Sequence, residues 1–600
     1  MPRVAFRVAP AGIAAAAALG VAAVPAGAAE IKVQNANDSG PNSLRAAITQ
    51  ANLTLAVEDR LIFPSTLTGK IELATPLPDI KGPLDIDGPG AARLSIDGNG
   101  DGIFYMHQAG SAYNAPMSIS GLTLTGGRSD MGGAIDNRAG GDLTVSGVSF
   151  VDNEASNPGQ EGGGAIAIGY PGNTLDVTDS DFSGNYSKAS GGAVSALYSD
   201  VTISGSTFNL NTSVGKGGAV FLEVADATVN GSRFTSNQST DMTGGAMSVG
   251  ISGKVAISES EFTGNSSKNS GAVIRADAQE VPPAPATIDI TGSTFDDNEA
   301  RSEGSGGVVV LGGFTTRVTN STLTGNRSRK YGSAIMSVEG PLAVESSTIT
   351  GNTIVEPVAE PSYQGAGVFG FGSTNVVGNS IVTGNLPADL STLPGETVST
   401  AFSLVGNPGN AGVIETVAGS NLAAVDPQLG PLADNGGPVP TRLPASTSPV
   451  INKGSSALTT DQRGLARPVN FRSIPFSAAV GANGADIGAV EVQGGPLPAP
   501  AIRFGKLRLN RKKGIATLAV TANRAGSVKL VGTRQIVARK ANLKAAGTAR
   551  VTVKARGKAA KKLRKKGRAR VRTIVRFTAG TGTGTVTKSR QVTLKKNPGK

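Results

Sequence analysis

The stretch KGGAVFLEVADATVNGSRFTSN, residues 216–237, decides the fold of this chain. It begins with a Gly pair and an apolar run, continues through an alternating segment to Phe234, and ends in a short turn at Asn237. The same order of features returns along the chain, at its closest every 26 residues, from Phe182 to Phe208 to Phe234. A unit repeated at this period predicts a stacked array in which each unit buries its apolar face against its neighbours.

Two motifs recur in phase. The Phe-x-x-Asn motif occurs at Phe150/Asn153, Phe182/Asn185, Phe208/Asn211, Phe234/Asn237, Phe262/Asn265 and Phe295/Asn298, and with an aliphatic residue for Phe at Leu323/Asn326, Ile349/Asn352 and Val382/Asn385. Between these anchors lie Gly-Ala-apolar triplets that start at Gly133, Gly164, Gly192, Gly218 and Gly245.

Inside each unit the apolar residues alternate, which is strand patterning, and no helical period is present. Short strands without helices between units predict an all-β, right-handed parallel β-helix in which equivalent residues stack at about 4.8 Å. The Phe column is expected to fill the interior. The Asn column is expected at a tight corner, where each amide pairs with the next and where Asn and Gly tolerate the left-handed conformation.

These motifs resemble the repeats of polymorphic outer-membrane proteins of bacteria, over about residues 120–385, and the wider fold resembles that of the pectate-lyase-like superfamily. We therefore expect a β-helix over 61–425. The chain lacks the catalytic motifs of the enzymes in that superfamily. The array has no His for the Gly-His-Gly of polygalacturonases, and Arg275 with Asp277 is the nearest approach to the Arg base and calcium-binding Asp of pectate lyases.

Composition excludes several kinds of site. The chain has no Cys and one His, His107, so thiol nucleophiles, disulfides and His- or Cys-based metal clusters are excluded. The loop Asp97-Gly98-Asn99-Gly100-Asp101-Gly102 has the opening of an EF-hand, but Gln108 stands where a bidentate Glu is needed. We interpret this loop as a Gly-rich corner and expect no metal and no cofactor.

The two carboxylates that stand just before the anchors are too far apart for glycoside hydrolysis, and the clusters Asp176/Asp179/Asp181 and Glu259/Glu261 are interpreted as solvated acidic faces. Just before the anchors, Asp181 and Glu261 stand three coils apart, about 14 Å at the stacking repeat. A glycosidase needs its two carboxyls about 5 to 10 Å apart. We therefore expect no catalytic residues in the array.

The N-terminal region contains two recognisable segments. Residues 1–28 have Arg3 and Arg7 before an apolar run and a small-x-small site, which predicts a secretory signal peptide. Within 29–60, Leu44, Ile48, Ala51 and Leu55 define one face of a helix with Ser43 as N-cap, which is expected to cover the first coil. The surrounding SGPNSLRAAITQAN resembles the SLREA-type motif of secreted bacterial β-helix proteins, with Ala46 in place of its Glu.

After the repeats, residues 426–493 contain four ordered motifs: 426–438 (DPQLGPLADNGGP), 448–451 (SPVI), 460–468 (TDQRGLARP) and 486–491 (DIGAVE). Together they resemble the C-terminal region of bacterial proteins of the choice-of-anchor domain Q type. That resemblance implies the end of a β-helix followed by a means of attachment. We expect the Asp and Arg residues to form salt-bridged loops over the lower edge of the solenoid.

Charge divides the chain. Of the 56 Lys and Arg residues, 30 lie in 501–600, where no Asp or Glu occurs, so 26 basic residues face 44 acidic ones in the other 500. Residues 494–500 are a Pro- and Gly-rich linker. Alternating runs at 506–509, 515–522, 527–531, 549–553, 569–577 and 583–594 predict a small immunoglobulin-like β-sandwich over 501–600, and 558–566 a short basic helix.

We interpret the chain as a secreted or cell-surface bacterial protein, structural or adhesive and without catalysis. A basic domain ties it to an anionic envelope polymer, with Lys561, Lys562, Arg564, Lys565 and Lys566 as the candidate contacts. No sequence-specific nucleic-acid partner and no membrane span after signal cleavage are expected. Two alternatives remain open: a polysaccharide-degrading enzyme, and a polysaccharide-binding protein with Tyr170, Tyr186 and Tyr198 as stacking residues.

Overall fold

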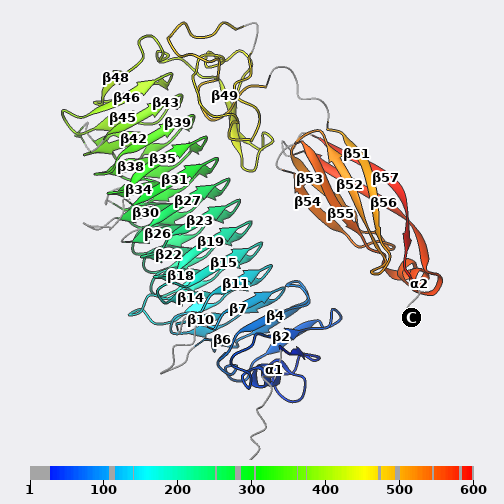
Figure 1. Cartoon of the computed structure of the whole chain (residues 1–600). Coiled ribbons are helices and arrows are strands. Elements are labelled where there is room, and N and C mark those ends of the chain that lie inside the picture. The colour runs from blue at the N-terminus through cyan, green and yellow to red at the C-terminus, as the bar shows by residue number, and fades with distance from the viewer. Residues whose placement is uncertain are drawn as a thin grey trace, which may run out of the picture.

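The computed structural model describes residues 28–597 except 107–114, 139–140, 251–252, 278–285, 303–305, 358, 361–362, 373, 471–473, 494–499, 544–545 and 580–583. Within these residues the repeats form a right-handed parallel β-helix with four parallel sheets of 15, 13, 11 and nine strands, named here A, B, C and D. Figure 1 shows the strands stacked along one axis. The predicted fold class is confirmed. The predicted signal peptide lies outside the described residues, except for Ala28.

Strand bounds follow the sheets. Sheet A contains β1 (Glu30–Lys32), β2 (Asp59–Ile62), β4 (Leu84–Asp87), β7 (Met117–Ser120), β11 (Leu143–Ser146), β15 (Thr174–Thr178), β19 (Asp200–Ser204), β23 (Ala227–Asn230), β27 (Lys254–Ser258), β31 (Thr287–Thr291), β35 (Thr315–Thr319), β39 (Leu342–Glu345), β43 (Asn375–Gly378), β46 (Thr397–Ala401) and β48 (Gly412–Glu415). Sheet B contains β3 (Gly69–Glu72), β5 (Leu94–Asp97), β8 (Thr123–Thr125), β12 (Ser149–Val151), β16 (Asp181–Ser183), β20 (Thr207–Asn209), β24 (Arg233–Thr235), β28 (Glu261–Thr263), β32 (Thr294–Asp296), β36 (Thr322–Thr324), β40 (Thr348–Thr350), β44 (Ile381–Thr383) and β47 (Leu404–Val405).

The other two sheets follow the same stacking order. Sheet C contains β6 (Phe104–Tyr105), β10 (Ile135–Asn137), β14 (Ile166–Gly169), β18 (Val194–Leu197), β22 (Val220–Glu223), β26 (Met247–Gly250), β30 (Ile274–Asp277), β34 (Val309–Gly312), β38 (Ile335–Val338), β42 (Gly365–Phe371) and β45 (Ala388–Thr392). Sheet D contains β9 (Arg128–Ser129), β13 (Glu154–Ala155), β17 (Tyr186–Ser187), β21 (Thr212–Ser213), β25 (Gln238–Ser239), β29 (Ser266–Ser267), β33 (Glu299–Ala300), β37 (Arg327–Ser328) and β41 (Thr353–Ile354).

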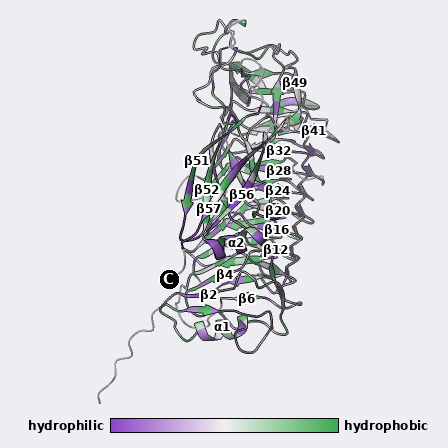
Figure 2. Cartoon of the chain, turned by 90° about the vertical axis from the view of Figure 1, so that its right-hand side faces the viewer, coloured by the Kyte–Doolittle hydropathy of each residue, from purple (hydrophilic) through white to green (hydrophobic). Residues whose placement is uncertain are grey.

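The interior is filled by the predicted Phe column. Phe150, Phe182, Phe208, Phe234, Phe262 and Phe295 are fully buried. Neighbouring rings stack with centroids 4.5 to 4.9 Å apart. Figure 2 shows their strands, β12 to β32, one above another. Because each ring contacts the next, the column couples the packing of successive coils.

The Asn column forms a continuous hydrogen-bonded ladder at the corner between sheets B and D. The Asn211 Oδ1 accepts from both the main-chain N–H (3.1 Å) and the Nδ2 (2.9 Å) of Asn185. The Asn211 Nδ2 donates to the Phe182 carbonyl at 3.1 Å and to the Asn237 Oδ1 at 2.9 Å. The predicted pairing of amides is thus confirmed, with every ladder group inside the core.

The left-handed residue at this corner is the one before each Asn, which corrects the expectation that Asn itself adopts that conformation. Leu210 has φ +57°, and Ser236, in the next coil, has φ +54°. Asn must keep ordinary backbone angles because its amide has to point inward along the axis. Where Gly occupies the preceding position, as at Gly184 (φ +66°), this corner is adopted without strain.

The predicted cap helix is present as α1 (Leu44–Ala51) at the N-terminal end of the solenoid (Figure 1). Ser43 is its N-cap and accepts the Ala46 N–H at 3.2 Å. Leu44 and Ile48 are buried in the solenoid core. The helix ends before Leu55, so this residue lies beyond it in a turn, which corrects the predicted four-residue face.

Residues 426–493 contact the outer face of sheet B. The hairpin strands β49 (Leu429–Ala433) and β50 (Thr441–Pro444) belong to this segment. The Thr322 Oγ1 donates to the Gln462 Oε1 at 2.6 Å, and the Thr294 Oγ1 donates to the Pro440 carbonyl at 2.7 Å. This cover buries Thr294 and Thr322, so the segment lies on a face of the solenoid that the expected position over the lower edge did not include.

Residues 501–597 form the predicted β-sandwich with its own core. One sheet has the order β51 (Ile502–Asn510), β52 (Ile515–Ala522), β55 (Gly547–Val553), and the other β54 (Arg539–Leu543), β53 (Gly526–Leu530), β56 (Arg568–Ala579), β57 (Thr585–Lys595). This antiparallel three-plus-four arrangement is that of immunoglobulin-like modules. The short strand β54 was not predicted, because Ala541 and Leu543 are its only two alternating apolar residues and its other three residues are polar.

We predict that Phe208→Ala destabilises the solenoid by about 3 to 5 kcal/mol, since the substitution leaves a cavity between two stacked rings. Leu210→Ala is the matched control: Leu210 is 58% exposed, so its loss should change the unfolding free energy by about 0.5 kcal/mol or less. Urea unfolding of both variants makes the measurement. Equal, small effects would show that the Phe column does not carry the core.

Candidate functional site

In the outer column of sheet B, the two carboxylates considered as a catalytic pair do not stand on neighbouring strands. Asp181 and Glu261 are separated by Thr207 and Arg233 in the register. Each carboxylate also has a structural partner: the Thr207 Oγ1 donates to Asp181 at 2.5 Å, and the Arg233 Nε donates to Glu261 at 2.7 Å. These contacts are those of a solvated strand surface.

The EF-hand-like loop follows strand β5 and is closed by protein groups. The Asp97 carboxylate accepts from Lys70 Nζ and from the Asn99 N–H, both at 2.9 Å. Within the described part of the chain, no cluster of three or more His, Cys, Asp or Glu residues could hold a metal ion. His107 and Gln108 lie outside the described residues.

A buried ionic network holds the 426–493 segment together. Arg463 pairs with Asp461 at 2.7 Å, and Arg467 pairs with Glu491 at 3.1 Å, with all four side chains nearly inaccessible. Burial lowers the pKa of Arg467 and raises that of Glu491. Burial, together with the nearby Glu491 charge, raises the pKa of Asp486 to about 7. The predicted salt-bridged loops exist, and both buried pairs join residues within the segment.

The three candidate tyrosines are not one site. Tyr170 and Tyr198 follow neighbouring sheet C strands and are 45% and 50% exposed. The Ser199 Oγ donates to the Tyr170 carbonyl at 3.1 Å and so joins the two turns. Tyr186 is on β17 in sheet D, at a different edge of the coil. Two tyrosines are therefore brought together, and the third is separate.

A groove on the outer face of sheet C has the composition of a ligand site. It has a volume of about 350 Å³ and spans strands β30 to β45. Its lining residues are Arg275, Asp277, Val310, Leu311, Gly312, Met336, Val338, Tyr363, Phe369, Phe371 and Leu393. The Tyr363 and Phe369 rings lie 5.7 Å apart, and Tyr331 meets Tyr363 edge-on at 5.4 Å.

One polar pair stands in this otherwise apolar groove. The Arg275 Nε donates to Asp277 at 2.7 Å, and the Arg275 Nη1 donates to the Ser270 Oγ at 3.1 Å. Gly312 is the register neighbour of Asp277, and a Cβ there would stand 3.2 Å from the Asp277 Oδ1. The glycine therefore leaves the carboxylate open to the groove. Sequence reasoning named Arg275 and Asp277 but missed the aromatic wall, because its rings come from separate coils.

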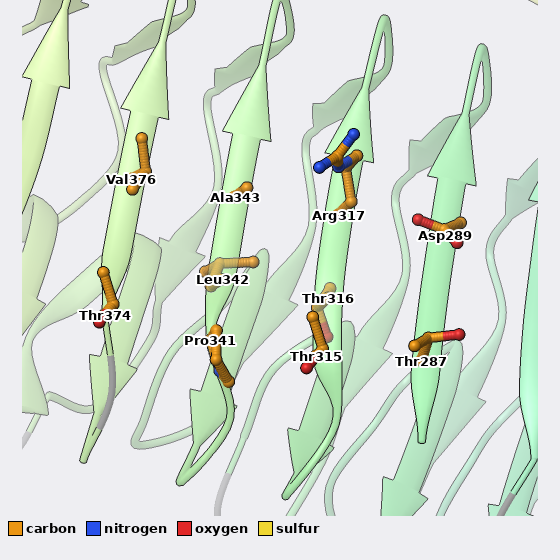
Figure 3. Close-up of a pocket in the computed structure, with 10 residues that line it drawn as sticks. All are labelled: Thr287, Asp289, Thr315, Thr316, Arg317, Pro341, Leu342, Ala343, Thr374 and Val376. Carbon is orange, nitrogen blue, oxygen red and sulfur yellow. The ribbon is translucent and has the colours of Figure 1, made fainter. Parts of the chain in front are cut away.

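A second hollow, of about 400 Å³, lies on the outer face of sheet A. Figure 3 shows it across β31, β35, β39 and β43, with Asp289 and Arg317 on neighbouring strands. Thr residues and small apolar side chains form most of its lining, and no aromatic residue is among them. This surface offers polar contacts but no stacking platform, so the sheet C groove is the stronger candidate.

The predicted basic residues lie on α2 (Gly557–Lys566), which connects β55 to β56. Lys561, Lys562, Arg564, Lys565 and Lys566 are all exposed. Figure 2 colours this helix hydrophilic over most of its length. The last three occupy the final turn, where positive charge is favourable to the helix dipole. None of the described helices is long and apolar enough to cross a membrane.

No family model matches the chain, and no curated protein matches it. The catalytic unit of a thermostable alpha-1,3-glucanase from Streptomyces thermodiastaticus is similar at 15% identity and a TM-score of 0.36, over 67% of this chain and 71% of that one. A mutant tailspike protein of E. coli bacteriophage HK620, in complex with a pentasaccharide, has 12% identity and a TM-score of 0.31, over 86% and 90%. PfbA, a surface adhesin of Streptococcus pneumoniae, has 11% identity and a TM-score of 0.25, over 61% and 89%. These similarities are too low to transfer a ligand or an activity.

We predict that the stability of the 426–493 segment falls as pH rises from about 4 to about 7. The folded chain keeps the Asp486 proton up to a pKa of about 7, whereas the ordinary value is 3.8, so between these values folding takes up a proton. Below 3.8 both states are protonated and the stabilisation is full. Asp486→Asn should reduce the drop in unfolding temperature between pH 5 and pH 8. An unchanged drop in the variant would contradict this assignment.

Proposed function

We propose that this chain is an exported bacterial surface protein in which a β-helix without catalytic activity is tied to an anionic envelope polymer by its basic sandwich. The observation that carries the proposal is the charge of that domain: 30 basic residues and no acidic one in 501–600. The remaining 500 residues have an acidic excess. Such an imbalance exceeds what solubility requires and favours a polyanionic partner.

The sequence motifs support export and attachment. Residues 1–28 have the pattern of a secretory signal. Residues 426–491 resemble the choice-of-anchor domain Q region, which in that family precedes a means of attachment. The sandwich stands where such an attachment module is expected, directly after the linker.

The sheet C groove favours a second, compatible function, the binding of a polysaccharide. A sugar ring has an apolar C–H face and a rim of hydroxyls. The aromatic wall at Tyr363 and Phe371 offers a surface for the first, and the Arg275–Asp277 pair offers donors and acceptors for the second. The Asp277 carboxylate can accept further hydrogen bonds besides those from Arg275. Its single carboxyl beside an arginine supports recognition and not hydrolysis, which needs two placed carboxyls.

The tether is tested by retention on purified bacterial cell walls. Binding through many charge contacts releases counterions, so we expect the mature chain to be retained at low salt and to dissociate steeply as salt rises. A chain limited to residues 30–494, which retains the solenoid core, should not be retained. Equal retention of both chains, or retention of the full chain that salt does not reverse, would refute the basic tether.

Glycan binding is tested with the double variant Tyr363→Ala/Phe371→Ala on a glycan array. We expect loss of at least about tenfold in affinity for any glycan that the mature chain binds, because an aromatic ring that stacks on a nucleobase contributes about 1 to 3 kcal/mol and we take a sugar ring to be similar. The control is Tyr170→Ala/Tyr198→Ala, on the same sheet but outside the groove. If the control loses binding and the groove variant does not, the exposed tyrosines are the site.

A further inference from the structure

One face of the sandwich concentrates cations more regularly than α2 does. Strand β56 alternates exposed and buried residues over its length. Arg568, Arg570, Arg572 and Arg576 face outward, whereas residues between them, such as Val571 and Val575, are in the core. Alternate residues of a strand are about 6.6 to 6.8 Å apart, so Arg568, Arg570 and Arg572 form a stripe along one line, which Arg576 continues beyond Ile574.

Neighbouring strands widen the stripe into a face. Lys529 on β53 is the register partner of both Arg576 on β56 and Lys540 on β54. At the other end of β56, Arg568 stands opposite Lys595 on β57. We call these residues the cationic sheet face: Lys529, Lys540, Arg568, Arg570, Arg572, Arg576 and Lys595, all exposed.

Nothing in the domain neutralises this face. Like charges directly opposite each other on neighbouring strands destabilise a sheet. No acidic residue occurs in 501–600, and none of the ion pairs between described residues includes this domain. On β57 the residues opposite Arg570 and Arg572 are the uncharged Thr593 and Gln591. The Arg572 Nε and Nη2 donate to the Ser589 Oγ at 3.3 and 3.1 Å, a contact that leaves the positive charge without a counter-charge.

The cations of α2 differ, because the fold itself accounts for part of them. Arg564, Lys565 and Lys566 occupy the last turn, where they complement the helix dipole. They also spread around the helix, since successive residues are about 100° apart. No helix dipole and no acidic side chain of the domain offsets the positive charges of the cationic sheet face. We therefore infer that these charges serve to bind a ligand.

We propose that a linear polyanion lies along β56 on the cationic sheet face, and that α2 only borders this surface. The inference rests on the proposed tether and assigns its contact surface. Arg is the side chain suited to bidentate contact with phosphate or carboxylate oxygens, and four arginines along one strand can contact several such groups of a linear chain.

The test compares two variants of the mature chain that lose equal charge. The face variant is Arg570→Gln/Arg572→Gln/Arg576→Gln, and the helix variant is Lys561→Gln/Lys562→Gln/Lys565→Gln. Binding to long-chain inorganic polyphosphate and to polygalacturonate is measured across a salt series. We expect the face variant to lose at least about tenfold in affinity and to show a shallower salt dependence, and the helix variant to lose about threefold or less.

The unfolding temperatures of the wild type and the two variants give a second readout that still distinguishes them if binding to the polymers is weak. Without ligand, the face variant should unfold at a higher temperature than the wild type, because repulsion between opposed cations is removed. The polymer should raise the unfolding temperature of the wild type and of the helix variant, but not of the face variant. Preference for one polymer identifies phosphate or carboxylate as the chemistry.

Two outcomes would overturn the inference in different ways. If both variants lose affinity equally, total charge and not the sheet face binds the polymer, and the tether itself still stands. If the wild type binds neither polymer but self-associates in a salt-sensitive manner, the partner is the acidic surface of another copy. In that case the proposed tether fails as well.

Discussion

The solenoid depends on a column of buried asparagine amides. From Asn185 to Asn385, each amide oxygen accepts the main-chain N–H and the amide N–H of the previous Asn. From Asn153 to Asn352, each amide nitrogen donates to the next Asn and to a main-chain carbonyl. The column ends at Asp389, whose Oδ1 accepts from Asn385. A turn between two strands exposes main-chain groups that strand pairing cannot satisfy, and in a buried corner each unpaired group is costly. The ladder satisfies them with one residue per coil, which lets the corner be short and the sheets continue.

Because the Asn ladder fixes the corner between sheets B and D, the coils differ from one another at their other edges. Sheet D is followed by loops of different length that lead to the Gly pairs, and the aromatic side chains of the sheet C groove come from these loops and from the strands after them. Sheet B is exposed in its first half and covered in its second by residues 426–493. Binding surfaces can therefore differ from coil to coil while the core keeps the same Phe and Asn positions. The sandwich has its own core, so its surface charge can differ from that of the solenoid without any change in the packing of the solenoid.

The sequence predicts the features that recur in every coil, and it does not predict the surfaces that are formed by residues from different coils. The Phe and Asn columns, the cap at Ser43 and the strands of the sandwich follow from local patterns, and the structure contains them. The position of residues 426–493 could not be predicted, because it depends on contacts such as Thr322 with Gln462, 140 residues apart. The sheet C groove could not be predicted either, because Tyr363 and Arg275 line it from different coils that only the stacking brings together. The alternating pattern of residues 569–577 predicts a strand. The cationic sheet face could not be predicted, because it depends on which residues of the neighbouring strands stand opposite the arginines of β56.

The most direct test of the ladder is the unfolding free energy of Asn211→Ala. This substitution leaves the main-chain N–H and the amide of Asn185, and the Phe182 carbonyl, without their bonding partner in a buried corner. Each unpaired group costs about 1 to 3 kcal/mol, so the predicted loss is about 3 kcal/mol or more, with faster amide hydrogen exchange at Asn185. Asn209→Ala, on the partly exposed side of the same coil, should change the free energy by about 0.5 kcal/mol or less. A loss below about 1 kcal/mol in Asn211→Ala, with unchanged exchange at Asn185, would contradict the dependence of the solenoid on this ladder.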